Sequence, residues 1–179
     1  MSDRSGGIQL LIRRAFKFEL KPNGMQIQLM KQFCGCARYV YNRTLSLEKS
    51  LYKKDSKHSF KYTEAANRLP EWKKKNPFLK ECHSQVLQQS LKDLEQAYIN
   101  FFRKRANFPK YKKKFQHDSI RFPQGVQLDE AKQQIRLPIS GTPVVVKHFR
   151  IKFFFSLAKQ DLFPYFFGCL GILFEVKCV

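Results

Sequence analysis

Residues 84–102, SQVLQQSLKDLEQAYINFF, hold the clearest secondary-structure signal in the chain. Apolar side chains recur there every three or four positions, which is the spacing of one face of an α-helix. Ser84 is a favoured N-cap residue type and stands just before the apolar repeat. We therefore predict an amphipathic helix that begins near Ser84. Its inward face is expected to consist of Val86, Leu87, Leu91, Leu94, Tyr98, Phe101 and Phe102.

A strand signal precedes this helix near the start of the chain. Residues 15–20, AFKFEL, alternate apolar and polar side chains, which is the period of a half-buried strand. We place this first strand within residues 8–22. The sequence KPNG at residues 21–24 ends it, and Asn23 has the side chain of an N-cap for the element that follows.

Residues 23–105 are predicted to form a helical unit. Apolar residues recur at helical spacing through residues 24–51, but Gly35 interrupts the run. We therefore predict two short helices across Gly35, which is a helix-turn-helix-like hairpin over residues 24–51.

The apolar period changes from helical to strand-like after residue 105. Proline and glycine residues separate short apolar runs there, which is typical of strands joined by turns. Residues 106–150 are therefore predicted to complete a small β-domain, with residues 23–105 as its helical insertion, in an α+β fold. The predicted strands are Ser119–Pro123, Val126–Leu128, Gln134–Leu137 and Val144–Phe149.

The charge of the chain indicates a polyanionic partner. Thirty-four Lys and Arg residues stand against 14 Asp and Glu residues, for a net charge of +20 in 179 residues. Such an excess repels itself unless a polyanion neutralises it, so nucleic acid or an anionic membrane is expected. Residues 151–179 carry a net charge of only +1 and seven of the 18 phenylalanines. The apolar runs are too short to span a bilayer, and we expect no membrane partner.

The strongest binding signal lies between residues 96 and 117. Seven cations and no acid stand there, interleaved with phenylalanine and tyrosine. Cations can neutralise phosphates while aromatic rings stack on bases, so we predict nucleic-acid contact. The alternative is a solvated basic loop whose aromatic residues belong to the core. The predicted contact residues are Arg103, Lys104, Arg105, Lys110, Lys112, Lys113 and Lys114.

Catalytic and metal-binding patterns are weak. The sequence has no Gly-Lys dipeptide, which excludes a P-loop. A CxC spacing is not that of a usual structural zinc site, so inert buried thiols explain the cysteines better. The odd cysteine count without a CxxC pair favours a reducing, cytoplasmic setting. We expect no metal and no cofactor. The rejected zinc set is Cys34, Cys36, Cys82 and His83.

Six short motifs occur along the chain in a fixed order. They are RAFKFELKPN (14–23), FCGCARYVYN (33–42), SQVLQQSLKDL (84–94), AYINFF (97–102), NFPKYK (107–112) and IRLP (135–138) followed by Gly141. Together they resemble the opening of the TnpB/OrfB family of insertion-sequence proteins, whose members are RNA-guided DNA nucleases. The resemblance covers roughly residues 13–147.

This resemblance implies a fold and a set of contacts. The strands would build a small oligonucleotide-binding-like β-barrel, the wedge domain, and the helices an inserted recognition lobe. In the family these parts hold guide-type RNA and recognise a short DNA motif beside the target. Ser84 and Gln88 match the motif-recognition positions, and Tyr62 aligns with a third. Glutamine can pair bidentately with adenine, whereas Ser84 could equally serve only as a helix cap.

The sequence departs from the family after about Lys147. The family's RuvC-like nuclease domain and zinc ribbon follow this region, and neither pattern occurs in the Phe-rich tail at residues 151–179. We therefore expect a frameshift or truncation near residues 147–150. The resulting protein would bind DNA and guide-type RNA, and it would not be an enzyme.

Three other functions stay open. The predicted hairpin could make the chain a helix-turn-helix regulator of the transposon, which would bind duplex DNA as a dimer without RNA. The chain could also be a non-functional remnant. A membrane-surface protein is a weaker alternative, because the tail has too few cations for a basic amphipathic helix.

Overall fold

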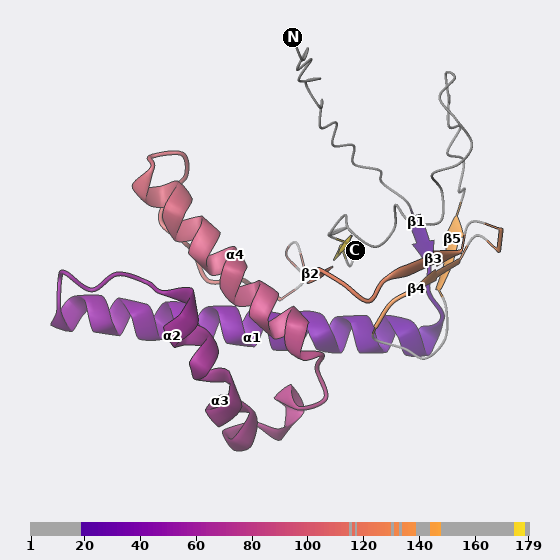
Figure 1. Ribbon diagram of the computed structural model, residues 1–179, viewed down its shortest axis with the longest axis horizontal. Helices are drawn as coiled ribbons and strands as arrows, with labels where there is room; N and C mark the ends of the chain where they lie inside the picture. The colour runs from indigo at the N-terminus through magenta and orange to yellow at the C-terminus, as the bar shows by residue number, and fades with distance from the viewer. Residues whose placement is uncertain are drawn as a thin grey trace, which may run out of the picture.

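Along the chain the helices come between the first strand and the remaining strands, whereas in space the first strand lies in one sheet with later strands, near one end of the first helix (Figure 1). A computed structural model describes residues 19–114, 116, 118–129, 131–132, 134–138, 144–147 and 174–177. The long helix α1 (Gly24–Lys54) is crossed by α4 (Ser84–Phe102). Between them come α2 (Tyr62–Asn67), α3 (Leu69–Lys75) and the 3-10 helix η1 (Pro77–Leu79). Helices and sheets are both present, as in the predicted α+β class.

α1 begins at the cap that the sequence predicts. The side-chain oxygen of Asn23 accepts a hydrogen bond from the main-chain N–H of Gln26 at 2.8 Å. In return, Gln26 Oε1 accepts one from the main-chain N–H of Asn23 at 2.9 Å. This reciprocal pair is a capping box, which satisfies two donors at the start of the helix.

The predicted break at Gly35 was wrong, because α1 continues through it as one helix of 31 residues. A glycine inside a helix costs about 1 kcal/mol relative to alanine. Burial of a single large apolar side chain contributes more than that, about 1.5–3 kcal/mol. α1 buries Phe33 before Gly35 and Val40 after it, so packing keeps the helix continuous. Helix is therefore present at residues 24–51, but the turn of the predicted hairpin is not.

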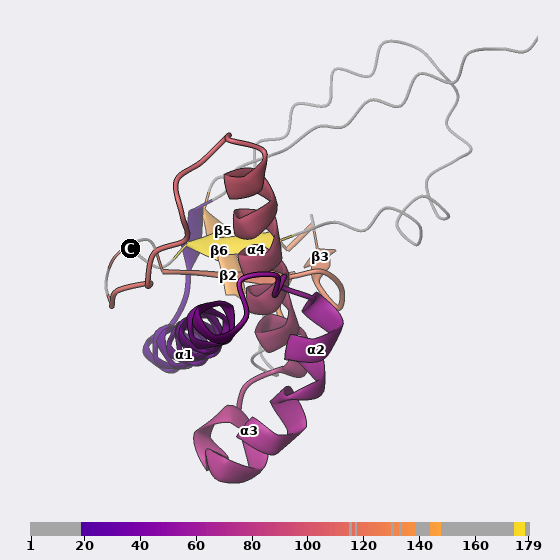
Figure 2. The same ribbon diagram turned by 90° about the vertical axis from the view of Figure 1, so that its left-hand side faces the viewer.

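α4 has the predicted position and buries most of its predicted face. Phe101 is only half-buried, and Phe102, which was predicted to face the core, is 69% exposed. The last turn of α4 rises clear of α1 in both views (Figures 1 and 2), so α1 does not cover that end of α4. The buried members of the face are Val86, Leu87, Leu91, Leu94 and Tyr98.

The strands form two antiparallel sheets. Their bounds are β1 (Glu19–Lys21), β2 (Ser119–Phe122), β3 (Gln127–Asp129), β4 (Gln134–Arg136), β5 (Val144–Lys147) and β6 (Phe174–Lys177). The four-stranded sheet has the order β1-β5-β4-β3, with Leu20 of β1 opposite Val146 of β5. In the second sheet β2 pairs with β6, which lies beside it in Figure 2.

β1, which precedes the helices, pairs with β5, which follows them, so these two strands share one sheet. Closure into a barrel stays a prediction, since the described strands form one four-stranded and one two-stranded sheet. Residues 8–18 of the predicted first strand lie outside the described residues, as does most of the tail at 151–179. The predicted frameshift also stays a prediction.

One core joins the helical lobe to the strands. Phe122 of β2 is fully buried in the same cluster as Val86 of α4. Where α4 crosses α1, the buried Ser90 hydroxyl donates a hydrogen bond of 2.7 Å to the main-chain carbonyl of Ala37. A small residue on each helix lets the two backbones approach closely. α4 is therefore held on two sides, and its opposite face is turned to solvent.

Candidate nucleic-acid interface

The exposed side of α4 presents two of the residues predicted to recognise DNA. Ser84 and Gln88 are one helical turn apart, and both are exposed. Lys92 follows one turn later and is also exposed, so the three side chains form a line. Lys92 was missed in the sequence analysis, although its spacing of four residues from Gln88 was a usable signal.

Residues of α2 and α3 flank this line. Lys73 of α3 donates a hydrogen bond from Nζ to Ser84 Oγ at 2.7 Å. Further along, Lys92 Nζ lies 5.7 Å from the centre of the Tyr62 ring, at the first turn of α2. The structure thus brings the three predicted residues Tyr62, Ser84 and Gln88 onto one surface. We call this surface, with Lys73 and Lys92, the α4 face.

Ser84 does not cap α4, so that part of the prediction was wrong. The N-cap is His83, whose side chain makes no capping hydrogen bond, and Ser84 is the first residue of the helix. The Ser84 hydroxyl is bound by the Lys73 ammonium group instead. A hydroxyl that accepts one hydrogen bond still has its own O–H to donate, so Ser84 can contact a ligand.

Three exposed cations stand at the other end of α4. Arg103 is the C-cap, and Lys104 and Arg105 follow it. The main-chain N–H of Lys104 donates to the carbonyl of Phe101 at 2.9 Å, and that of Arg105 to the carbonyl of Asn100 at 2.8 Å. Lys104 has a φ of 57°, a left-handed conformation that glycine usually supplies at this point of a helix. We call Arg103, Lys104 and Arg105 the basic turn.

The segment after the basic turn is anchored to α1. Asn42 Nδ2 donates to the main-chain carbonyl of Lys112 at 2.9 Å, and the Lys112 N–H donates to Asn42 Oδ1 at 2.8 Å. The Lys112 ammonium group lies 4.6 Å from the centre of the Tyr41 ring. Burial lowers the pKa of Lys112. Lys112 is thus an anchor, whereas the predicted contacts Lys110, Lys113 and Lys114 are exposed.

Aromatic rings pack beside residues 110–114, which we call the basic segment. The Phe108 ring meets Phe101 edge-on at 5.2 Å and Tyr98 edge-on at 5.8 Å. Lys49 of α1 places its ammonium group 4.5 Å from the centre of the Tyr111 ring. Cation–ring contacts of this kind hold the segment close to α1. Phe108 and Tyr111 both keep more than a third of their surface exposed, so they are not purely core residues.

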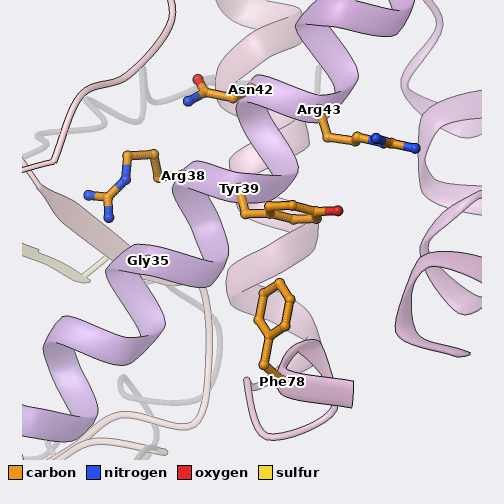
Figure 3. A pocket seen from close by; sticks show the side chains of 6 residues that line it. All are labelled: Gly35, Arg38, Tyr39, Asn42, Arg43 and Phe78. Carbon is orange, nitrogen blue, oxygen red and sulfur yellow. The ribbon is translucent and has the colours of Figure 1, made fainter. Parts of the chain in front are cut away.

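An open hollow of about 540 Å³ lies on α1 (Figure 3). The side chains of Arg38 and Arg43 point to opposite sides of it, with the rings of Tyr39 and Phe78 between them. Those rings pack edge to face, with centres 5.2 Å apart. The sequence analysis named no contact residue here, because nothing in the local pattern indicates that η1 meets α1. The lining residues are Gly35, Arg38, Tyr39, Asn42, Arg43 and Phe78.

The cysteines of the helical lobe are buried free thiols, as predicted for Cys34, Cys36 and Cys82. A hydrogen bond between two of these thiols lowers the pKa of Cys36 and raises that of Cys82. Within the part of the chain that the structure describes, no three His, Cys, Asp or Glu side chains are grouped so as to hold a metal ion. None of the described helices combines the length and apolarity needed to cross a bilayer.

Comparison with known proteins adds an independent line of support. The helix-turn-helix domain of the OrfB family of IS605 elements matches residues 12–57. The protein InsQ of Escherichia coli (strain K12), which is named as an RNA-guided DNA endonuclease, is 48% identical over 130 residues. The N-terminal part of this chain belongs to the TnpB/OrfB family. The alignment covers 72% of this chain and 32% of InsQ.

A second TnpB/OrfB relative gives the same result. A protein of Streptomyces pristinaespiralis, also named as an RNA-guided DNA endonuclease, is 38% identical over 104 residues, or 56% of this chain and 25% of that protein. This TnpB/OrfB chain therefore spans about a third or less of the length of these curated relatives. The matched residues 12–57 include β1 and all of α1, so the described part of the family's helix-turn-helix segment folds here as a strand and one long helix.

Proposed function

We propose that this chain is the nucleic-acid-binding part of a TnpB/OrfB-type transposon protein, which contacts a guide-type RNA and a short DNA motif beside its target. The observation that carries this proposal is the α4 face. Tyr62, Ser84 and Gln88 come from two helices and lie together on one solvent-facing surface. Lys73 and Lys92 flank them.

The chemistry of the α4 face suits a duplex. The major groove of DNA admits an α-helix, and an exposed glutamine can pair bidentately with adenine there. Lysines contact phosphates, which positions a helix without reading sequence. In this proposal Gln88 supplies base recognition, while Lys73 and Lys92 fix the register of α4 on the DNA.

The basic turn and the lysines after it suit an RNA backbone. Arg103, Lys104 and Arg105 are exposed at one end of α4, and Lys110 and Lys113 are exposed on the segment that Asn42 anchors. Their contact with phosphates would be largely electrostatic and would weaken with added salt. These groups belong to the +20 excess that a polyanion must neutralise.

Cleavage is not part of this proposal. The aligned region makes up about a third of InsQ. By the family resemblance, the nuclease domain of such proteins follows that region. We propose nucleic-acid binding for the aligned region and assign none of its residues a role in cleavage. The strands of the two sheets would form the wedge of the family, against which the RNA lies.

The regulator alternative has lost its main support. It required a helical hairpin with its turn at Gly35, and α1 is continuous through that residue. A regulator would bind its duplex equally well with and without RNA, so the RNA dependence of DNA binding separates the two functions.

Selection from duplexes with a randomised motif tests the proposal. Gln88→Ala should relax the preferred motif, because a bidentate base contact discriminates by about 1–3 kcal/mol. Gln28→Ala removes another exposed glutamine, on α1, and should leave the motif unchanged. Equal motifs from wild type and Gln88→Ala would refute the role of α4. A wild-type chain without affinity for nucleic acid would refute the whole proposal.

A further inference from the structure

We infer that the hollow on α1 holds an unpaired nucleotide strand, with a base stacked on Phe78 and the sugar-phosphate backbone close to Gly35. This inference rests on the proposed nucleic-acid binding and adds a contact surface built from α1 and η1. The strand that it takes is single, which distinguishes it from the duplex expected at the α4 face.

Gly35 is the first argument, because none of the described residues around it requires a glycine there. It keeps helical geometry inside α1, unlike Gly125, which has a positive φ of 79°. Among the residues that the structure describes, a Cβ atom at position 35 would meet only Nη2 of Arg38, at an ordinary 3.9 Å. Alanine would fit and would be the better helix former. What the glycine provides is bare backbone in the wall of the hollow, which suits the close approach of a ligand.

Phe78 is the second argument, because it is exposed and yet fixed. The residue Phe78 is 42% exposed, while the neighbouring Leu79 is fully buried and holds η1 in place. The Tyr39 ring stands at 84° to the Phe78 ring, and the Tyr39 hydroxyl donates to Asn76 Oδ1 at 3.4 Å. A rigid exposed ring is a stacking platform for a base. Bases in a duplex already stack on one another, so a free ring selects an unpaired strand.

The charges around the hollow fit a phosphate backbone. Arg38 donates a hydrogen bond from Nη1 to Asp118 Oδ1 at 2.7 Å. Its other terminal nitrogen, Nη2, is the one that lies near Gly35. Arg43 is exposed on the opposite side of the hollow (Figure 3). One carboxylate against two guanidinium groups leaves a positive site, and guanidinium groups bind phosphates in two-point contacts. Asn42 is already bonded to Lys112, so it shapes the wall of the hollow.

The test measures binding of the full chain to labelled oligouridine and to the same strand paired with oligoadenine. Phe78→Ala should weaken oligouridine binding roughly tenfold, and Phe78→Trp should restore it. Gly35→Ala should raise the unfolding temperature or leave it unchanged, yet weaken oligouridine binding. Two matched controls should bind as wild type does. Gly24→Ala makes the same change at the start of α1, where a Cβ meets nothing within 4 Å, and Tyr52→Ala removes a ring that is 57% exposed.

Each outcome decides the inference. Weaker binding by Gly35→Ala and Phe78→Ala, at unchanged stability and with unchanged controls, supports it. If both variants bind normally while a triple Ala variant of the basic turn binds weakly, the hollow is refuted and the proposed function survives. An equal loss for single strand and duplex refutes the preference for unpaired nucleotides. No binding by wild type refutes both proposals together.

Discussion

Asn42 forms two hydrogen bonds with the main chain of Lys112, a residue 70 positions later, at 2.9 Å and 2.8 Å. One amide side chain thereby satisfies both the carbonyl and the N–H of a residue in an irregular segment. A neighbouring strand would normally provide those two partners. Together with the cation–ring contacts of Lys49 and Lys112, this side chain fixes the position of the basic segment relative to α1.

Replacing Asn42 by alanine should loosen that segment. The change leaves two main-chain groups without their partners, which should lower the free energy of unfolding by about 1–3 kcal/mol. Urea unfolding measures this loss, and amide exchange at Lys112 should become faster. Asn67→Ala, at the exposed end of α2, is the matched control and should have little effect. Equal effects of the two substitutions would contradict the anchoring role of Asn42.

Replacing Lys104 by glycine should increase the stability of the fold and weaken RNA binding. Its φ of 57° costs a residue with a Cβ roughly 1–2 kcal/mol, and glycine avoids that cost. Lys104→Gly should therefore raise the free energy of unfolding by about 1 kcal/mol and weaken RNA binding, because a phosphate contact is lost. Arg103→Gly removes the same charge at a negative φ of −79° and should give no gain in stability. A Lys104→Gly variant that binds RNA as well as wild type does would remove Lys104 from the interface.

The salt dependence of RNA binding should show that Lys113 contacts phosphate and that Lys112 does not. Lys113 is exposed, so Lys113→Ala should reduce the slope of log affinity against log salt by about one. The Lys112 ammonium group lies over the Tyr41 ring, so Lys112→Met should leave that slope unchanged and lower stability instead. Salt titration of both variants decides the point. The reverse pattern would mean that Lys112 is the phosphate contact.

Alkaline pH should destabilise the fold through Tyr98. Burial raises the pKa of Tyr98 from the usual 10.0 to about 12. The unfolded chain therefore loses this proton at a lower pH than the folded chain does. The contribution of Tyr98 to the free energy of unfolding is fully present below pH 10. It is lost as the pH rises to about 12, by at most about 3 kcal/mol. Urea unfolding of Tyr98→Phe over this range should show a smaller loss than wild type, and equal losses would exclude Tyr98 as the cause.

The sequence predicts those elements that local pattern controls. The apolar repeat of α4 and the cap at Asn23 are both visible within a few residues, and both are confirmed. Gly35 misled the prediction because its local preference is outweighed by the packing of α1 on α4. Phe102 misled it for the opposite reason, since a helical stripe does not tell where the partner helix ends.

The candidate site is less predictable, because most of it depends on tertiary contacts. Gln88 and Lys92 share a helix face that spacing alone reveals. Lys73 reaches Ser84 only because α3 folds back on the start of α4, and no spacing rule indicates that contact. The hollow likewise depends on a tertiary contact, because Phe78 lies in a separate turn of 3-10 helix and packs against Tyr39 of α1.

The pairing of β1 with β5 sets an order of events during synthesis on the ribosome. Leu20 of β1 cannot pair with Val146 of β5 until Val146 has been synthesised, which at typical elongation rates happens roughly ten seconds later. The contacts between α1 and α4 lie within residues 24–102 and are complete well before that moment. The helical lobe can therefore fold while β1 is still an open edge, exposed to pairing with other nascent chains. Translation speed over the lobe should thus influence how much of the protein reaches its native sheet.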